Sequence, residues 1–172
     1  MKIIIFSDTH SYLPPALKAV KQVGDIDMIL HLGDCIDDAE KISAETGIQY
    51  KAVRGNRDWH ADAPYIDFWE LEGIKIMALH GHLEDISRNE PDEERQQKFK
   101  ILADKAKSKN AGIVLYGHDH LAEKFHIDNI LFFNPGEMVY GAKKFTCGVL
   151  EIKAGEFWIE HVEIRQGDPF KS

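Results

Sequence analysis

The first 53 residues alternate between apolar runs and helical segments, and this order restricts the fold more than any other feature. Ile3–Phe6, Met28–Leu32 and Gln49–Val53 have the length and composition of strands. Residues 13–23 carry apolar side chains near helical spacing, and residues 37–46 also have helical character. A strand–helix–strand–helix–strand order needs crossover connections, and it therefore predicts a parallel sheet flanked by helices.

The second half of the chain predicts a different arrangement. Ile66–Leu71 and Ile74–Leu79 flank Glu72-Gly73 and predict a β-hairpin. The charged stretch 83–98 predicts a surface loop that leads into a polar helix over residues 92–108. Further strands are predicted after this helix, at Ile113–Tyr116, Glu123–Ile127, Ile130–Phe133, Phe145–Ile152 and Phe157–Ile164. We expect a single α/β (α+β) domain over residues 1–172, a four-layer αββα sandwich of two mixed β-sheets flanked by helices.

Charge and cysteine content exclude several classes of protein. The net charge of −8 at pH 7 argues against a chain whose main role is to coat nucleic acid or an anionic membrane. Cys35 and Cys147 form no CxxC pair, so neither a disulfide framework nor a structural zinc site is expected. The apolar runs are too short for a signal peptide or a membrane span, and we expect a cytoplasmic protein. A homo-oligomer is compatible with the small size, although no residue pattern requires one.

Side chains that can bind metal follow five of the predicted strands. They are Asp8, His10, Asp34, Asn56, His80, His82, His118 and His120. Ligands of open α/β sheets gather at the carboxyl ends of strands, so these segments are expected to meet at one edge. In Asp8-x-His10 an extended backbone would direct both side chains to the same face.

The types of these residues indicate which cations they could bind. Aspartate, asparagine and histidine without a thiolate suit Mn²⁺, Fe²⁺, Zn²⁺ or Ni²⁺ better than Ca²⁺. Two aspartates, one asparagine and at least four histidines exceed the needs of one ion. They suffice for two ions about 3.5–4 Å apart that share a bridging carboxylate.

Five ordered motifs resemble those of the calcineurin-like metallophosphoesterase superfamily. They are Asp8-x-His10, Gly33-Asp34-x-x-Asp37, Gly55-Asn56-Arg57-Asp58, His80-Gly81-His82 and Gly117-His118-x-His120. Asn134-Pro135-Gly136 resembles a further motif of the small, single-domain bacterial and archaeal phosphodiesterase branch. The five motifs together, in the family's order, are far more specific than any one of them.

The resemblance implies a centre of two divalent metal ions, with Mn²⁺ as the first choice and Ni²⁺, Fe²⁺ or Zn²⁺ as alternatives. One ion would be held by Asp8, His10, Asp34 and His120. The other would be held by Asp34, Asn56, His80 and His118, so that Asp34 is the bridge. A water or hydroxide between the ions would attack phosphorus in line with the leaving alkoxide.

Three residues near these motifs need a separate interpretation. Arg57 occupies a position where many family members have histidine. Because a guanidinium is a poor general acid but can bind a phosphate, protonation of the leaving group would fall to His82 or to water. Asp58 is expected to orient a ligand histidine rather than to bind metal. Glu137 stands where the branch often has serine.

Other polar and aromatic residues are expected to have structural roles. His31 is expected in the core, Cys35 as a small buried filler, Asp37 as a helix cap or a contact to a ligand, and Asp119 facing solvent. Four aromatic residues could pack in the core or line the rim of the site, and the core or a subunit interface is the favoured expectation: Trp59, Tyr65, Phe68 and Trp69.

The leading functional hypothesis is a metal-dependent phosphodiesterase that acts on a small phosphate ester. A phosphomonoesterase or a nucleotide-polyphosphate hydrolase remains open, because the same ions would attack either phosphate. A non-catalytic scaffold, like the retromer subunit that shares this fold, would not need the full ligand set. A nuclease would be expected to carry additional binding segments and a basic surface.

Overall fold

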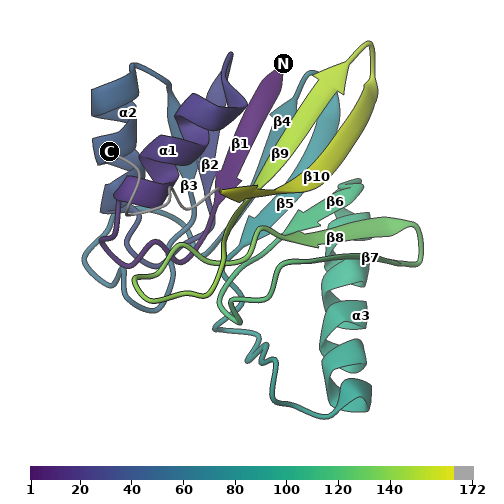
Figure 1. Cartoon of the computed structure of the whole chain (residues 1–172). Coiled ribbons are helices and arrows are strands. Elements are labelled where there is room, and N and C mark those ends of the chain that lie inside the picture. Colours follow the sequence, from purple (N-terminus) through teal and green to yellow (C-terminus); the bar gives the residue numbers. More distant parts are fainter. Residues whose placement is uncertain (165–172) are drawn as a thin grey trace.

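Alternate side chains of strand β1 (Lys2–Phe6) pack on opposite faces of their sheet. Ile3 and Ile5 belong to the apolar cluster between two sheets, whereas Ile4 and Phe6 belong to the cluster beneath helices. All four side chains are buried, so the strand needs cover on both faces. The computed structural model, which describes residues 1–164, provides it with a second sheet on one side and helices on the other (Figure 1).

The first sheet has five strands in the order β10-β9-β1-β2-β3. Its other members are β2 (Met28–His31), β3 (Tyr50–Ala52), β9 (Phe145–Lys153) and β10 (Glu156–Ile164). Strands β1, β2 and β3 are parallel, and β9 and β10 are antiparallel to their neighbours. Helices α1 (Pro14–Val23) and α2 (Asp37–Thr46) cover the outer face of this sheet.

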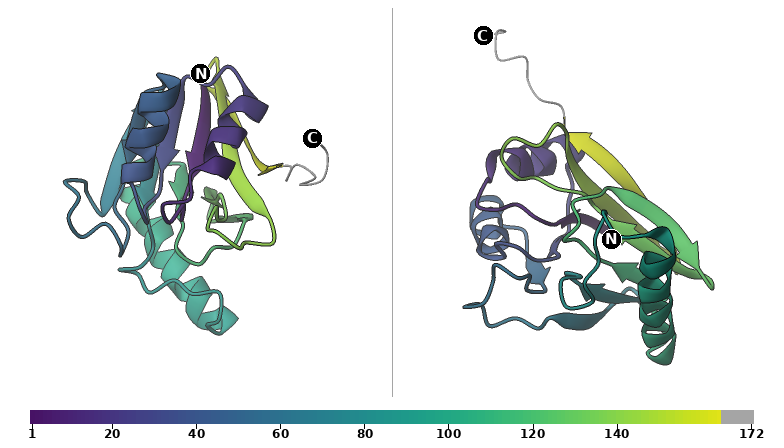
Figure 2. Two further views of the ribbon diagram at one scale, coloured as in Figure 1. Left: turned by 60° about the vertical axis from the view of Figure 1, so that its left-hand side comes forward. Right: turned by 90° about the horizontal axis from the view of Figure 1, so that it is seen from below.

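The second sheet has five strands in the order β4-β5-β6-β8-β7. They are β4 (Ile66–Leu71), β5 (Ile74–Leu79), β6 (Ile113–Leu115), β7 (Glu123–Ile127) and β8 (Ile130–Asn134). Strands β5, β6 and β8 are parallel, and the edge strands β4 and β7 are antiparallel. Helix α3 (Asp92–Ser108) covers the outer face, so α3 lies on the opposite side of the sandwich from α1 and α2 (Figure 2, right).

The predicted αββα sandwich of two mixed sheets is confirmed. Every predicted helix and strand is present, and no end differs from the prediction by more than one residue. The parallel start of the chain and the hairpin at residues 66–79 are also as predicted. The single-domain prediction extended over residues 165–172, which lie outside the described residues. Within residues 1–164, no helix is both long enough and apolar enough to cross a membrane.

The two sheets are joined by hydrogen bonds where β1, β2, β5 and β6 end, at the lower edge of the sandwich in Figure 1. The Asp8 amide donates to the carbonyl of Gly33 at 3.1 Å, which joins the loops after β1 and β2. The Gly117 amide donates to the carbonyl of His80 at 3.0 Å, which joins the loops after β5 and β6. The His118 amide donates to Asp8 Oδ2 at 3.0 Å and thereby connects the two sheets. All candidate ligands except Asn56, which follows β3, therefore lie on four loops that meet at one edge.

Candidate metal centre

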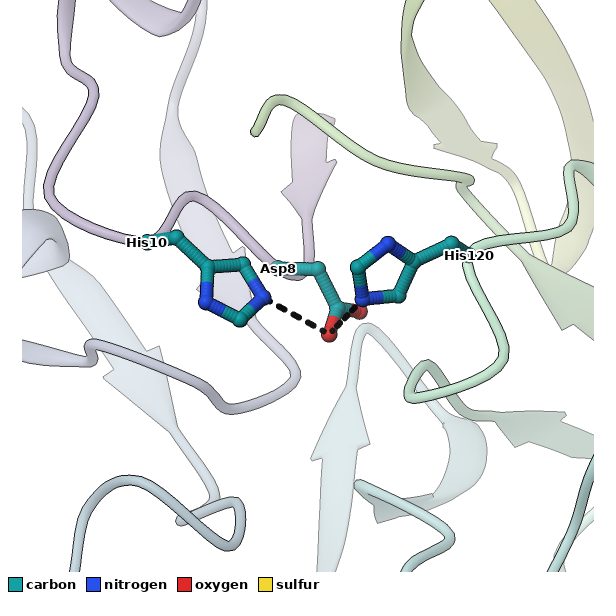
Figure 3. Close-up of side chains that lie close together, drawn as sticks. All are labelled: Asp8, His10 and His120. Atoms are coloured by element: carbon teal, nitrogen blue, oxygen red, sulfur yellow. Dashed lines mark ion pairs between the residues drawn. The ribbon is translucent and has the colours of Figure 1, made fainter. Parts of the chain in front are cut away.

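The carboxylate of Asp8 lies at the centre of the first group of candidate ligands. Its Oδ2 accepts hydrogen bonds from the Ser7 hydroxyl at 2.5 Å and from the His118 amide at 3.0 Å. Its Oδ1 is 3.2 Å from His120 Nε2 and 3.7 Å from His10 Nε2. The two imidazoles flank this one oxygen (Figure 3). Asp8, His10 and His120 therefore form a group that could hold a metal ion.

Asp34 lies between two histidines and turns a different oxygen towards each. Its Oδ1 is 3.4 Å from His80 Nε2, and its Oδ2 is 3.7 Å from His10 Nε2. This is the placement that a bridging carboxylate needs. Asp8, Asp34 and His80 form a second group that could hold a metal ion, and it shares Asp8 with the first.

Three ligand atoms in this site are buried without a hydrogen-bond partner among residues 1–164. They are Asp8 Oδ1, His10 Nε2 and His80 Nε2. The Nδ1–H of His80 donates to the Leu32 carbonyl at 2.7 Å, which leaves the Nε2 lone pair free to face the carboxylates. Burying unpaired polar atoms is costly, and a cation would satisfy all three. The residues present therefore fit a metal centre.

Two other predicted ligands lie beside this group. The His118 ring is 5.0 Å from the His80 ring, measured between centroids. Asn56 is exposed in the turn after β3, between Gly55 and Arg57. Within residues 1–164, no hydrogen bond joins the Asn56 side chain to the other candidate ligands. The structure thus brings five of the seven predicted ligands into direct contact, places His118 next to them, and leaves Asn56 on the rim.

Burial and neighbouring charges shift the pKa values of these groups in opposite directions. Burial would raise the pKa of the Asp8 carboxyl, but His10 and His120 outweigh it and hold this pKa well below its usual range. The Asp8 carboxylate, opposed by burial and aided by Glu137, raises the pKa of His120 to about 9. Burial, followed by the nearby His80, lowers the pKa of His118. Electrostatic attraction between Asp8 and His120 therefore holds these two side chains together.

The backbone at the candidate ligands is left-handed rather than extended. The φ angles are 54° at Asp8, 47° at His10, 60° at Asp34, 74° at His118 and 61° at His120. The extended backbone considered for Asp8 and His10 is therefore absent, although the two side chains do meet, with His10 Nε2 3.7 Å from Asp8 Oδ1. Left-handed residues turn the chain sharply at the end of each strand, and the side chains then point back over the sheet edge.

Two glycines allow the loops after β2 and β3 to approach each other. A Cβ atom on Gly55 would lie 2.3 Å from Asp34 Oδ1, and a Cβ atom on Gly33 would lie 2.7 Å from His80 Nδ1. Any larger residue at either position would displace a candidate ligand. These glycines are therefore part of the construction of the site.

Comparison with known proteins identifies the family of the chain. Residues 1–155 match the family model of the calcineurin-like phosphoesterase superfamily domain. The chain belongs to this superfamily. The resemblance to calcineurin-like metallophosphoesterases is confirmed, and the chain is a hydrolase of this family.

Small bacterial and archaeal proteins are similar over most of the phosphoesterase. A probable metallophosphoesterase of Mycoplasma pneumoniae is 32% identical over 137 residues, which cover 80% of this chain and 79% of that protein. A phosphodiesterase of Methanocaldococcus jannaschii is 29% identical over 175 residues, which cover 91% of this chain and 96% of that protein. The crystal structure of a predicted phosphoesterase from Streptococcus pneumoniae matches with a TM-score of 0.72 at 27% identity, and the match covers 96% of this chain and 93% of that chain.

Asp58 of the phosphoesterase binds backbone amides, and the expectation that it orients a ligand histidine is wrong. Its Oδ2 accepts from the amides of Asp34 at 2.8 Å and Gly55 at 2.7 Å. Its Oδ1 accepts from the amides of Cys35 at 2.7 Å and Ile36 at 2.9 Å. One buried carboxylate therefore fixes the loop that carries Asp34 against the loop that carries Asn56.

Asp38, which the sequence did not single out, supports the loop that carries Asp8 and His10. Its Oδ2 accepts from the Thr9 hydroxyl at 2.7 Å and from the Ser11 amide at 2.8 Å. The Thr9 hydroxyl also contacts His31 Nε2 at 3.1 Å. His31 is fully buried, as expected, whereas Asp37 is exposed and makes no capping hydrogen bond. The support expected from Asp37 therefore comes from the next residue.

Asp119 is buried, with 6% of its surface exposed, and the expectation that it faces solvent is wrong. Its Oδ2 accepts from Arg95 of α3 at 2.6 Å, and its Oδ1 accepts from the Asn134 side chain at 2.7 Å. Arg95 and Asn134 lie far from Asp119 in the sequence, and only the fold brings them together. This contact fixes the loop that carries His118 and His120.

The four aromatic residues do not share one environment. Trp69 is buried between the sheets, as expected for a core residue. Trp59 is 71% exposed, and Tyr65 and Phe68 are 38% and 37% exposed, so these three are not core residues, and a subunit interface remains the prediction for them. Cys35 is only half-buried, with its Sγ 3.6 Å from the Ser11 hydroxyl, and is not a buried filler.

Glu137 of the phosphoesterase contacts the candidate metal centre through His120. The Nδ1–H of His120 donates to Glu137 Oε2 at 2.5 Å, while Nε2 of the same ring faces Asp8. A carboxylate on the far nitrogen of a ligand histidine fixes its tautomer and orientation and increases its basicity. This chain has the carboxylate where the family branch often has serine.

Replacing Glu137 with glutamine is expected to weaken Mn²⁺ binding by about tenfold, because the amide keeps an acceptor but loses the charge that holds His120. Calorimetric titration of Mn²⁺ would measure the affinity, and the ¹⁵N shifts of the imidazole would report the tautomer of His120. Glu156→Gln, an exposed change at the start of β10, is the matched control. Equal affinity in Glu137→Gln and the control would show that Glu137 has no role in metal binding.

Proposed function

We propose that the protein is a phosphodiesterase that hydrolyses small phosphate diesters with two divalent cations. The observation that carries the proposal is the convergence of three buried ligand atoms that have no partner: Asp8 Oδ1, His10 Nε2 and His80 Nε2. The phosphodiesterase of M. jannaschii, similar over 91% of this chain, supports the choice of a diester. A cytoplasmic location remains a prediction.

We assign the ligands to two ions as the resemblance to the family implies. Asp8, His10, Asp34 and His120 would hold one ion, and Asp34, Asn56, His80 and His118 would hold the other. The donors are oxygen and imidazole nitrogen, which suit Mn²⁺. When bound, such ions supply positive charge that stabilises the reacting phosphoryl group and lowers the pKa of water towards neutrality.

Arg57 is placed to bind the substrate phosphate. Its amide donates to Asp34 Oδ1 at 3.0 Å, which fixes the residue next to the candidate bridge. Its side chain is 61% exposed, and Nε is 3.9 Å from Asp34 Oδ2. The guanidinium therefore lies at the edge of the centre with most of its donors free, and two of them can bind one phosphate.

The substitution Arg57→Ala is expected to raise KM for a diester about tenfold and to leave kcat nearly unchanged, because the lost contact binds substrate and transition state alike. Steady-state kinetics would separate the two parameters. Lys51→Ala removes an exposed cation from β3 and serves as the control. Unchanged KM and kcat in Arg57→Ala would exclude this role.

His82 is the candidate for protonating the leaving group. It belongs to neither group of contacting ligands, and its Nδ1 is buried without a partner. Its ring lies 5.4 Å from the His80 ring and 6.2 Å from the His118 ring, measured between centroids. The His82 imidazole therefore lies next to the candidate ligands but belongs to neither group that could hold a metal ion.

If His82 donates this proton, His82→Ala should slow diesters with alkyl alcohol leaving groups about 100-fold and affect nitrophenyl esters much less. Nitrophenolate leaves without protonation, whereas an alkoxide does not. A series of diesters with leaving groups of graded acidity would measure the difference, with His126→Ala, an exposed change on β7, as control. An equal loss for all leaving groups would assign the proton to water.

The proposed function is tested by removing metal with a chelator and restoring Mn²⁺, Ni²⁺, Fe²⁺ or Zn²⁺ one at a time. Hydrolysis of bis(p-nitrophenyl) phosphate would be compared with that of p-nitrophenyl phosphate, the matching monoester. Metal-dependent cleavage of the diester is the expected result. Preference for the monoester would favour the phosphomonoesterase hypothesis. Absence of turnover by folded, metal-loaded protein would favour the hypothesis of a non-catalytic scaffold.

A further inference from the structure

Two adjoining hollows open beside the metal centre on the side of His120. The first, of about 330 Å³, is lined by Arg88, His118 and His120 among others. The second, of about 500 Å³, is lined by Arg88, His120, Glu137 and Lys143 among others. Because Arg88 and His120 belong to both, the hollows form one cleft, which we call the basic cleft. It leads from a candidate metal ligand to the loop between β8 and β9.

The carboxylates in the basic cleft each contact a side chain of the protein. Asp85 contacts Lys98 at 3.4 Å, Asp119 contacts Arg95 at 2.6 Å, and Glu137 contacts His120 at 2.5 Å. Lys144, which also lines the cleft, is paired with Glu163 at 2.9 Å. The carboxylates of the cleft are therefore already engaged by neighbouring side chains of the protein.

The two remaining cations of the basic cleft have no partner in the part of the chain that the structure describes. Arg88 and Lys143 are exposed, and neither makes an ion pair or a side-chain hydrogen bond within residues 1–164. They lie on different loops, 80–91 after β5 and 135–144 after β8, which can be followed in Figure 2. Arg88 and Lys143 create a local positive potential in a hollow next to the candidate metal centre. This potential contrasts with the chain as a whole, whose net charge is −8.

A phosphate group is the ligand that matches this arrangement. Guanidinium binds two phosphate oxygens at once, and ammonium adds a compact positive charge. The scissile phosphate would be held at the metal ligands and Arg57, so the basic cleft is available for a different anionic group of the same molecule. His120 lines both hollows and is also a candidate metal ligand, so an anionic group linked to the scissile phosphate could reach the cleft.

We propose that the basic cleft binds a second phosphate of the substrate, so that preferred substrates are phosphate diesters that carry a further phosphate group. The inference rests on the proposed phosphodiesterase function and specifies its substrate class. The further phosphate could belong to a nucleotide 3′-phosphate or to a polyphosphate chain. Both sources present the same chemistry to Arg88 and Lys143, and substrates can distinguish them.

The experiment uses Mn²⁺-loaded protein and matched p-nitrophenyl esters. The p-nitrophenyl ester of thymidine 5′-phosphate would be compared with the same ester bearing a 3′-phosphate, and with the p-nitrophenyl ester of thymidine 5′-triphosphate. We expect kcat/KM to be about tenfold higher for at least one of the esters with additional phosphate. The ester with the larger gain identifies the source of the second phosphate.

The double variant Arg88→Ala/Lys143→Ala should reduce this preference to about one, and the preference should also shrink as salt is added. The control variant Lys109→Ala/Lys153→Ala lacks two exposed lysines that do not line the cleft, and it should retain the preference for esters with additional phosphate. Thermal melting would show that both variants fold. In metal-free protein, amide shifts of residues 88 and 143 should respond to thymidine 3′,5′-bisphosphate more than to thymidine 5′-phosphate.

The outcomes separate the two proposals. If the wild type does not hydrolyse bis(p-nitrophenyl) phosphate with any ion, the phosphodiesterase proposal fails. If it hydrolyses that diester but treats all three thymidine esters alike, only the second-phosphate inference is overturned. A preference that survives in Arg88→Ala/Lys143→Ala would also overturn it, since the additional phosphate would then bind elsewhere.

Discussion

Replacing Asp34 with asparagine is expected to lower turnover of bis(p-nitrophenyl) phosphate by about 1,000-fold or more, which is about 4 kcal/mol of transition-state stabilisation. Asp34 faces both His10 and His80, so the loss of its charge weakens both proposed metal sites together. The amide of asparagine can still accept from the Arg57 amide, and asparagine tolerates the left-handed backbone at this position. The chain should therefore stay folded while bound Mn²⁺ falls, which metal analysis of dialysed protein would measure.

Asp37→Asn provides the matched control for this prediction. It makes the same chemical change three residues later, at an exposed position in the first turn of α2. Turnover and metal content should stay close to those of the wild type. If Asp34→Asn kept its metal and most of its turnover, the assignment of Asp34 as the bridge would have to be abandoned.

The substitution Asp58→Asn is expected to lower the free energy of unfolding by about 2–6 kcal/mol, because two buried amides would lose their acceptor at about 1–3 kcal/mol each. The aspartate accepts from four backbone amides, two at each oxygen. Asparagine has one oxygen, and its NH₂ group would face the other pair of amides as a second donor. Urea denaturation of metal-free protein would measure the change without a contribution from bound ions.

Asp62→Asn, at an exposed position four residues later, is the control and should leave stability unchanged. Activity should also fall in Asp58→Asn, because the loops of Asp34 and Asn56 would separate. If both variants unfolded at the same urea concentration, the four hydrogen bonds to Asp58 would contribute nothing to stability. The loop after β2 would then depend on its glycines alone.

The layers of the fold were predictable because strand and helix signals in this chain are local. β1 is a continuous apolar run, and the hairpin of β4 and β5 has a Glu72-Gly73 turn between two apolar segments. Residues 66–79 therefore specify their own pairing. The five motifs also lie directly after such strands, so the convergence of the candidate ligands follows from the parallel arrangement.

The supporting contacts were not predictable, because each depends on residues that only the fold brings together. Asp119 is buried by Arg95 of α3, and no local signal in Gly117-His118-Asp119-His120 indicates this partner. Asp38 and Asp37 are adjacent identical residues, and only the direction of α2 decides which of them faces Thr9. The contact of Glu137 with His120 was signalled only as a departure from the family pattern.

The left-handed backbone at the ligands affects which substitutions would stabilise this protein. A non-glycine residue in this region costs roughly 1–2 kcal/mol, less for aspartate, and five ligands adopt it: Asp8, His10, Asp34, His118 and His120. Their sum, several kcal/mol, is comparable with the whole stability of a small domain. Glycine in place of His10, His118 or His120 would remove this backbone strain. A variant that no longer binds metal could therefore have a higher melting temperature than the wild type. At these ligand positions, a substitution that raises stability would therefore lower activity. Substitutions that stabilise an active enzyme have to be sought elsewhere in the sandwich.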